Sequence, residues 1–308
     1  QHIGAPANPI VKKGDHVLLT KAEHASNVLP WFELADELDL VIDYIPLDEH
    51  LHVTLEQVKE AIQKDTKVIS IAQISNVIGD ERPVEEIISY AHQLGIYVIV
   101  DGAQSVPHKK VDVKKMDVDF FVFSLHKMCG PTGVGILYGK EEHLYKMRPT
   151  CFGGGMNLSF TSDRTSIPTR FEAGTLNISG IIASFEAVSY LEKIGMDQIE
   201  TYEKELKMYA LSRLQEVPGI QIYNPDTDSP IISFNIEGIF AQDLAIYLDR
   251  YHICVRAGNH CAKILIDEIG IKNTCRMSLY FYNTKEEIDQ LITALKNPNI
   301  LEESLSVN

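Results

Sequence analysis

Two short segments of this chain bring together an acid, an amide, a hydroxyl, an imidazole and a lysine. They are Asp101-Gly-Ala-Gln104 and Ser124-Leu-His-Lys127. Apolar and β-branched residues precede each segment, at 95–100 and 120–123, a pattern typical of buried parallel strands. Because open α/β sheets bind ligands at the carboxyl ends of their strands, we expect both segments to meet at one edge of a sheet.

These residue types match the chemical needs of pyridoxal phosphate. A lysine amine can form a Schiff base with an aldehyde, and an acid can keep the ring nitrogen of this cofactor protonated. We therefore predict that Lys127 and Asp101 have these two roles and that Gln104 bonds the phenolic oxygen. Ser124 and His126 suit the phosphate. Each residue alone has an ordinary alternative, such as a surface lysine or a turn-forming aspartate.

A histidine follows the first predicted strand after a short loop. This is His24, in the segment Ala22-Glu-His-Ala-Ser-Asn27. Its flat imidazole could stack on a pyridine ring. The alternative is a polar histidine of a surface loop.

The segment Val255-Arg-Ala-Gly-Asn-His-Cys-Ala262 holds a candidate nucleophile. Cys261 lies in a polar, glycine-containing loop near Arg256 and His260, and cationic neighbours stabilise the nucleophilic thiolate. Arg276 could form a bidentate salt bridge to a substrate carboxylate, or a structural ion pair. We expect the other cysteines to be buried as small apolar side chains; they are Cys129, Cys151, Cys254 and Cys275.

Composition narrows the class of protein. The chain has 308 residues, 45% of them hydrophobic, which is enough for a large domain and a smaller one. Its net charge of −15 argues against a nucleic-acid or anionic-membrane partner. No apolar run approaches the roughly 18 residues of a membrane span, and no signal peptide is visible. Five cysteines without CxxC spacing favour a reduced, cytoplasmic chain with neither a disulfide framework nor a zinc site.

Periodicity predicts an α/β fold with a mostly parallel sheet. Strand-like runs lie at 16–20, 40–45, 67–72, 96–100, 119–123 and 134–138, with helices between them at 26–37, 54–64 and 83–94. A long helix is predicted at 180–216, kinked near Gly195. Short elements follow at 219–223, 230–236, 240–250, 253–256, 275–280 and 284–296, and we expect the tail after Asn297 to fray. The predicted division is a large cofactor-binding domain at 1–180, a connecting helix at 181–217 and a small α+β domain at 218–308.

Taken together, these motifs resemble a cysteine desulfurase of the class V aminotransferase fold. Ser-Leu-His-Lys127, Asp101-Gly-Ala-Gln104, the His24 loop, Phe171-Glu-Ala-Gly-Thr175 and the Cys261 loop occur in the order of that family. The short loop Arg-x-Gly-x-His-Cys-Ala is similar to the SufS/CsdA-like group, which includes selenocysteine lyases, rather than to the NifS/IscS-like group. Asn259 stands where many relatives have histidine.

The resemblance implies a type I pyridoxal-phosphate fold and the conversion of L-cysteine to L-alanine, with a persulfide left on Cys261. Asn76 and Arg276 would hold the substrate carboxylate, and Arg256 would line the pocket. Thr175 would reach the cofactor phosphate of a neighbouring subunit, which implies a homodimer. The sulfur acceptor would be a SufE- or SufU-type protein serving iron–sulfur cluster assembly.

The family also has a further N-terminal segment with a Gly-Thr-Thr-Glu-like phosphate-binding motif. This sequence starts at Gln1 without it, so we expect a longer native enzyme with the N-terminal portion of the fold restored. Three alternatives remain at this stage. They are a selenocysteine lyase on the same scaffold, a simple transaminase, and a non-catalytic, truncated interaction partner.

Overall fold

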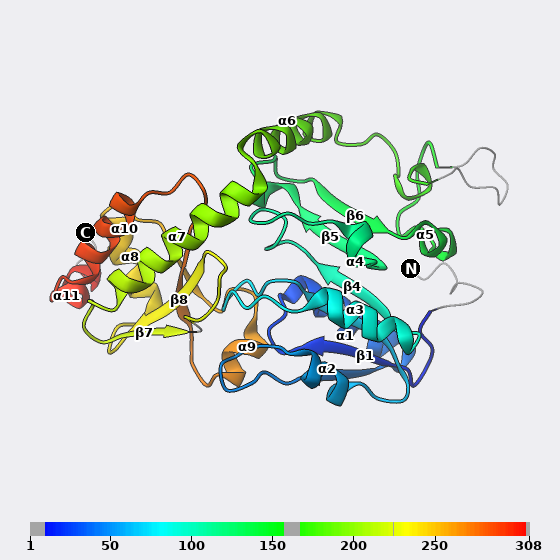
Figure 1. Ribbon diagram of the computed structural model, residues 1–308, viewed down its shortest axis with the longest axis horizontal. Coiled ribbons are helices and arrows are strands. Elements are labelled where there is room, and N and C mark those ends of the chain that lie inside the picture. Colours follow the sequence, from blue (N-terminus) through cyan, green and yellow to red (C-terminus); the bar gives the residue numbers. More distant parts are fainter. Residues whose placement is uncertain (1–9, 157–166, 224, 306–308) are drawn as a thin grey trace.

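A computed structural model describes residues 10–156, 167–223 and 225–305. Six strands form the larger sheet in the order β2-β1-β3-β4-β5-β6 (Figure 1). Strands β1 to β5 are parallel and β6 is antiparallel to β5. The predicted mostly parallel sheet is confirmed. Its strands are β1 (His16–Thr20), β2 (Val41–Ile45), β3 (Thr66–Ala72), β4 (Tyr97–Asp101), β5 (Phe120–Ser124) and β6 (Gly135–Gly139).

Helices cover both faces of this sheet because its central strands are apolar on both sides. On one face, Leu18 and Ile69 pack with α2 (Leu55–Ala61) and α3 (Val84–Gln93). On the other face, Val17 of β1 packs with α1 (Leu29–Leu38). Burying each such side chain contributes about 1.5–3 kcal/mol. The strand order and this packing bring the carboxyl ends of β3, β4 and β5 to a common edge.

Two long helices follow the larger sheet and lead to the second one (Figure 1). They are α6 (Ile178–Ile194) and α7 (Met196–Leu214), and they break at Gly195, whose φ of +97° suits glycine. The predicted interruption at Gly195 is therefore confirmed, but it divides the segment into two helices instead of kinking a single one. The short helices α4 (Val113–Met116) and α5 (Glu141–Lys146) flank β5 and β6 in the chain.

The second sheet is antiparallel, with the order β7-β8-β10-β9. Its elements are β7 (Ile220–Tyr223), β8 (Ile231–Ile236), α8 (Ala241–Asp249), β9 (Arg256–Gly258), α9 (Lys263–Glu268), β10 (Thr274–Ser278), α10 (Lys285–Leu295) and α11 (Ile300–Leu305). A core of α7, α8 and α10 side chains covers this sheet. Helix α9 packs on Ala22, Val77 and Ile78, and so joins the second sheet's loops to the first.

Three expectations about this region and the cysteines were wrong. The strand predicted at 253–256 begins only at Arg256, where pairing with β10 becomes possible. The tail after Asn297 forms α11 instead of fraying, because Ile300 is buried in the core of the second sheet. Cysteines 129, 151 and 254 are exposed, since they lie in loops that no core covers; only Cys275 is buried. All five are free thiols.

Within the described ranges, no helix is long and apolar enough to cross a membrane.

Candidate active site

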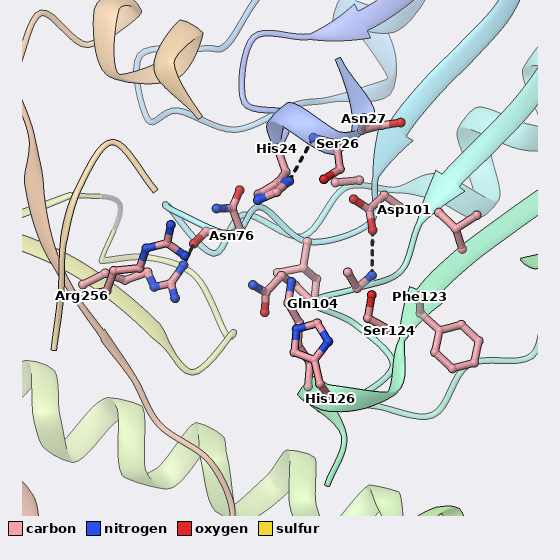
Figure 2. A pocket seen from close by; sticks show the side chains of 16 residues that line it. His24, Ser26, Asn27, Asn76, Asp101, Gln104, Phe123, Ser124, His126 and Arg256 are labelled. Carbon is pink, nitrogen blue, oxygen red and sulfur yellow. Dashed lines mark hydrogen bonds between the residues drawn. The ribbon is translucent and has the colours of Figure 1, made fainter. Parts of the chain in front are cut away.

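A cavity of about 360 Å³ lies where the carboxyl ends of β3, β4 and β5 meet the second sheet. Figure 2 shows the predicted side chains surrounding this space. Nine of the eleven predicted site residues line it: His24, Asn76, Asp101, Gln104, Ser124, His126, Lys127, Arg256 and Arg276. The other two are outside its lining. Cys261 contacts Arg256, and Thr175 is exposed in the loop before α6.

The end of β4 presents Asp101 to the cavity through a tight turn. Its Oδ1 accepts a hydrogen bond of 2.9 Å from the backbone N–H of Ala103. The turn requires glycine at position 102, because a Cβ there would lie 2.0 Å from the ring of Phe121. Gln104 also lines the cavity, one turn further on. In this motif Asp101 ends the strand, and Gly102 leaves room for the ring of Phe121. Asp101 and Gln104 both line the cavity.

Lys127 ends a short 3-10 helix, η2 (Leu125–Lys127), directly after β5. Burial lowers the pKa of its amine, Asp101 opposes this shift, and Arg276 and Arg256 add to it. Among the described residues Lys127 forms no salt bridge. A buried lysine facing a cavity without a paired carboxylate is suited to act as a nucleophile or a base.

His24 precedes the 3-10 helix η1 (Ala25–Asn27) and faces the same cavity (Figure 2). Its Nδ1 accepts a 3.1 Å hydrogen bond from the backbone N–H of Ser26, so the neutral ring has its proton on Nε2. Burial lowers the pKa of His24, and the nearby Lys127 lowers it further. The cavity therefore has a neutral, flat imidazole on one of its walls.

Two arginines of the second sheet and an amide from the loop after β3 form another wall of the cavity. Arg256 and Arg276 are direct partners in the pairing of β9 with β10. Arg276 Nη1 donates to the backbone oxygen of Asn76 at 2.8 Å, while its Nε has no partner in the described structure. The Oδ1 of Asn76 is also buried without a partner. Burial and the charge of Arg256 lower the pKa of Arg276 to about 10. The guanidinium N–H groups of Arg276 can bind a carboxylate, whereas the unpartnered Asn76 Oδ1 is an acceptor.

Cys261 lies in a strained loop between β9 and α9. Both His260 (φ +51°) and Cys261 (φ +57°) adopt left-handed backbone conformations, which are uncommon outside glycine and concentrate at functional sites. Two hydrogen bonds hold this pair against the first sheet's loops. Asn76 Nδ2 donates to the oxygen of His260, and the N–H of Ala25 donates to the oxygen of Cys261, each at 2.7 Å. The exposed Cys261 Sγ lies 3.3 Å from Arg256 Nη2.

His260 gives this loop a testable pH dependence. It is buried, and its Nε2 contacts the hydroxyl oxygen of Thr274 at 2.7 Å. Burial and the nearby Arg276 lower its pKa from 6.5 to about 4. Between these pH values the unfolded chain binds a proton that the folded chain does not, so the free energy of unfolding falls as pH falls through this window. The effect is about 3 kcal/mol.

A His260→Gln variant is therefore expected to lose this part of the pH dependence. Urea unfolding at pH 7 and pH 4.5 measures it in both proteins. The wild type should lose more stability between the two values than the variant does. Equal losses would show that His260 is not held neutral by the fold.

Three polar residues beneath the cavity were not predicted as site residues. Glu23, Asn27 and Arg82 are buried, and Asn27 lines the cavity. Hydrogen bonds from these residues connect the turn after β1 with β3, and the loop after β3 with the end of β3. Only Glu23 had a visible sign, as a charged residue between an apolar strand and His24.

Comparison with known proteins identifies the family. The family model described as "Aminotransferase class-V" matches residues 3–291. A "Probable cysteine desulfurase" of Halalkalibacterium halodurans is 44% identical over 288 residues, which cover 92% of this chain and 71% of that protein. A "Cysteine desulfurase" of Cronobacter sakazakii is 42% identical over 286 residues, or 92% of this chain and 70% of that protein.

Solved structures agree with this assignment. The cysteine desulfurase CsdA from Escherichia coli superposes with a TM-score of 0.90 at 34% identity, covering 95% of this chain and 73% of that one. The apo cysteine desulfurase of Thermococcus onnurineus gives a TM-score of 0.89 at 36% identity, covering 93% and 73%. This chain belongs to the class V aminotransferase family. The resemblance and fold class expected from the motifs are confirmed.

Proposed function

We propose that this chain is a pyridoxal-phosphate-dependent cysteine desulfurase that converts L-cysteine to L-alanine and keeps the sulfur as a persulfide on Cys261. The main support is the position of the Cys261 thiol beside Arg256, which lines the cavity together with Lys127 and Asp101. A simple transaminase would need no such thiol. The two relatives compared above are named "Probable cysteine desulfurase" and "Cysteine desulfurase".

The donor set of the cavity fits pyridoxal phosphate. Lys127 would bind its aldehyde carbon, Asp101 its ring nitrogen and Gln104 its phenolic oxygen. His24 would stack on the ring, and Ser124 and His126 would bind the phosphate. When bound, the cofactor supplies an electron sink for negative charge at the substrate Cα. Lys127 supports this assignment, because it lines the cavity and forms no hydrogen bond or salt bridge with a described residue.

Substrate binding is assigned to the wall formed by Arg276 and Asn76. The Nε–H of Arg276 is a buried donor without a partner among the described residues, and this donor suits a carboxylate. The Oδ1 of Asn76 is a buried acceptor without a partner among them, and it suits an N–H group of the substrate. The guanidinium and the amide N–H groups would hold the carboxylate of L-cysteine, and Arg256 would line the pocket. This anchoring fixes the orientation of the amino acid relative to Lys127 and Cys261.

The reaction uses Lys127 and Cys261 in turn. The Lys127 amine removes the proton from the substrate Cα and later returns a proton. The Cys261 thiolate attacks the substrate sulfur, so that an S–S bond forms as the C–S bond breaks. L-cysteine and the Cys261 thiol thus become L-alanine and a Cys261 persulfide, without an added oxidant or reductant. Arg256 stabilises the thiolate before the attack.

A homodimer with shared active sites is part of this proposal. Exposed apolar side chains cluster at the start of α6, directly after the exposed Thr175: Leu176, Ile178, Ile181, Ile182 and Phe185. An apolar face of this kind favours a protein partner over water. A second copy placed there would bring Thr175 toward the other copy's cofactor phosphate.

The dimer can be tested at this face. Replacing Phe185 by glutamate is expected to convert a dimer to monomers and to weaken cofactor binding. Sedimentation equilibrium of the wild type and the variant measures the first effect, and absorbance titration the second. A Tyr145→Glu variant, also on an exposed aromatic but away from α6, serves as the control. A monomeric wild type would contradict this part of the proposal.

The destination of the sulfur is proposed from the resemblance to the SufS/CsdA-like group. A SufE- or SufU-type protein would take the persulfide sulfur for iron–sulfur cluster assembly. Free thiols throughout the chain support a reducing, cytoplasmic location. The two sheets support a division into a large domain at 1–180, a connecting helix at 181–217 and a small domain at 218–308.

The function is tested by measuring alanine release from L-cysteine, with a reductant present, using protein reconstituted with pyridoxal phosphate. Alanine and sulfide in equal amounts would support a desulfurase. Activity that depends on an added keto acid would indicate a transaminase instead. A folded protein that neither acquires the cofactor's visible absorbance nor turns over cysteine would favour a non-catalytic interaction partner.

A further inference from the structure

Glu23 is a buried carboxylate directly before the cavity residue His24. Its side chain is 2% exposed. Carboxylates are rarely buried to this degree unless they are paired, because leaving water costs several kcal/mol. A reason for keeping a charge at this position must therefore lie in its surroundings.

The contacts of Glu23 fasten the His24 turn to β3. Its Oε2 accepts hydrogen bonds from Asn27 Nδ2 and from the backbone N–H of Ala72, both at 2.8 Å. Its Oε1 accepts the hydroxyl proton of Thr20. Asn27 closes the turn from the other side, since its Oδ1 accepts a 2.6 Å bond from the hydroxyl of Ser70. These hydrogen bonds fix the position of the His24 turn relative to β3.

The residue that Glu23 bonds on β3 is also paired with the strand end that carries Asp101. Ala72 is the direct neighbour of Asp101 in the pairing of β3 with β4. The next N–H along β3, that of Gln73, donates to the backbone oxygen of Asp101 at 2.9 Å. The carbonyl of Ala72 accepts Arg82 Nη1 at 3.0 Å. The peptide groups on both sides of Ala72 are therefore held by Glu23 and Arg82, immediately beside Asp101.

Charge also connects Glu23 to the site. Burial raises the pKa of Glu23 most strongly, and the charge of Asp101 adds to the shift. Arg82 and the hydrogen bonds from Thr20 and Asn27 oppose it. Arg82 in turn pairs with the buried Asp80, at 3.0 Å between Nε and Oδ2. Arg82 and the hydrogen bonds that the two Glu23 oxygens accept thus favour the ionised form of Glu23, against the effect of burial.

We propose that Glu23 is a positioning residue of the cofactor site, which fixes His24 and Asp101 relative to each other and adds a second negative charge that interacts with Asp101. The proposal rests on the pyridoxal-phosphate function proposed above. A nearby negative charge favours the protonated form of a ring nitrogen, and the electron sink depends on that form. Asp101 would make the direct contact, and Glu23 would act through it.

A Glu23→Gln variant tests this inference, because it keeps the side-chain size and removes the charge. The cofactor-free protein is titrated with pyridoxal phosphate, and the visible absorbance of the complex is followed from pH 6 to pH 10. We expect a dissociation constant at least about tenfold higher than in the wild type. We also expect the pH midpoint of the visible band to move to lower pH, since losing a negative charge disfavours the protonated form.

Glu203→Gln is the matched control. Glu203 is equally buried, is bonded to His108 at 2.9 Å and belongs to α7, outside the cavity lining. Both variants should lower the melting temperature, but only Glu23→Gln should change cofactor affinity and the band midpoint. If the two variants behave alike in all three measurements, Glu23 is structural only and the inference is wrong.

A milder variant keeps the inference testable if Glu23→Gln does not fold. Thr20→Val removes one hydrogen bond to the Glu23 carboxylate and leaves the others. It should shift affinity and band midpoint in the same directions by a smaller amount, and unchanged values would overturn the inference. A wild type that binds no pyridoxal phosphate would overturn the proposed function along with it, whereas a wild type that binds it normally isolates the role of Glu23.

Discussion

Replacing Cys261 by alanine is expected to leave binding of the cofactor and of L-cysteine intact and to lower alanine formation by about three orders of magnitude or more. Cys261 is exposed at the cavity edge, and its Sγ is the sulfur atom that Arg256 contacts, at 3.3 Å. No cysteine is among the described residues that line the cavity, so without this thiol we expect no acceptor for the substrate sulfur. The Lys127 amine and the carboxylate-binding wall remain, so the early steps should continue.

Alanine release measures the expected loss of turnover. The visible spectrum of the cofactor, recorded on addition of L-cysteine, shows whether the cofactor and the substrate still bind. Mass spectrometry of the wild type should find one added sulfur on the peptide that contains Cys261. The matched control is Cys254→Ala, which removes another exposed thiol from the segment leading into the same loop. It should retain full activity.

The same variant separates the desulfurase from its rival on this scaffold. In a selenocysteine lyase, selenium can leave without attack by Cys261, so Cys261→Ala would lose activity with cysteine and keep it with selenocysteine. Undiminished alanine release from cysteine by this variant would contradict the persulfide step in either enzyme. A loss with both substrates is the result we expect.

The parts of the fold that were predictable are those whose residues are apolar on both faces. Strands such as β3 and β4 are largely apolar and β-branched, so their position and type could be predicted from the expected burial of these residues. Gly195 marked the helix break because its φ is unfavourable for other residues. The three-residue β9 and the C-terminal α11 were misjudged. Both depend on tertiary contacts: β9 forms by pairing with β10, and α11 forms because Ile300 is buried in the core of the second sheet.

The site divides in a similar way. Asp101 and Lys127 could be placed at the cavity from sequence, because Asp101 ends β4, Lys127 closely follows β5, and the sheet brings these strand ends together. The hydrogen bond from Asn76 to the oxygen of His260 joins residues that are 184 positions apart, and no local pattern encodes it. Glu23 was missed for the same reason, since its role depends on Ala72 of another strand. Local sequence patterns do not predict such contacts between polar groups that are far apart in the chain.

The second large effect is expected from Lys127→Ala, which should abolish covalent attachment of the cofactor and reduce turnover to background. Burial lowers the pKa of this amine, with Arg276 and Arg256 adding to the shift, so a larger share of it is unprotonated near neutral pH than of an ordinary lysine. An unprotonated amine is required both to attach to an aldehyde and to accept the Cα proton. Arginine should not replace it, because a guanidinium stays protonated in proteins.

Borohydride reduction followed by mass spectrometry measures the attachment. In the wild type the cofactor mass should be found on the peptide with Lys127, and in the alanine variant it should be absent. Lys110→Ala is a suitable control, since Lys110 is exposed in the segment before α4 and does not line the cavity. Weakened but measurable non-covalent binding should persist in Lys127→Ala, because Asp101, Gln104 and His24 are unchanged. Equal covalent labelling of the variant and the wild type would show that another amine holds the cofactor. The assignment of the cavity's chemistry to the end of β5 would then be wrong.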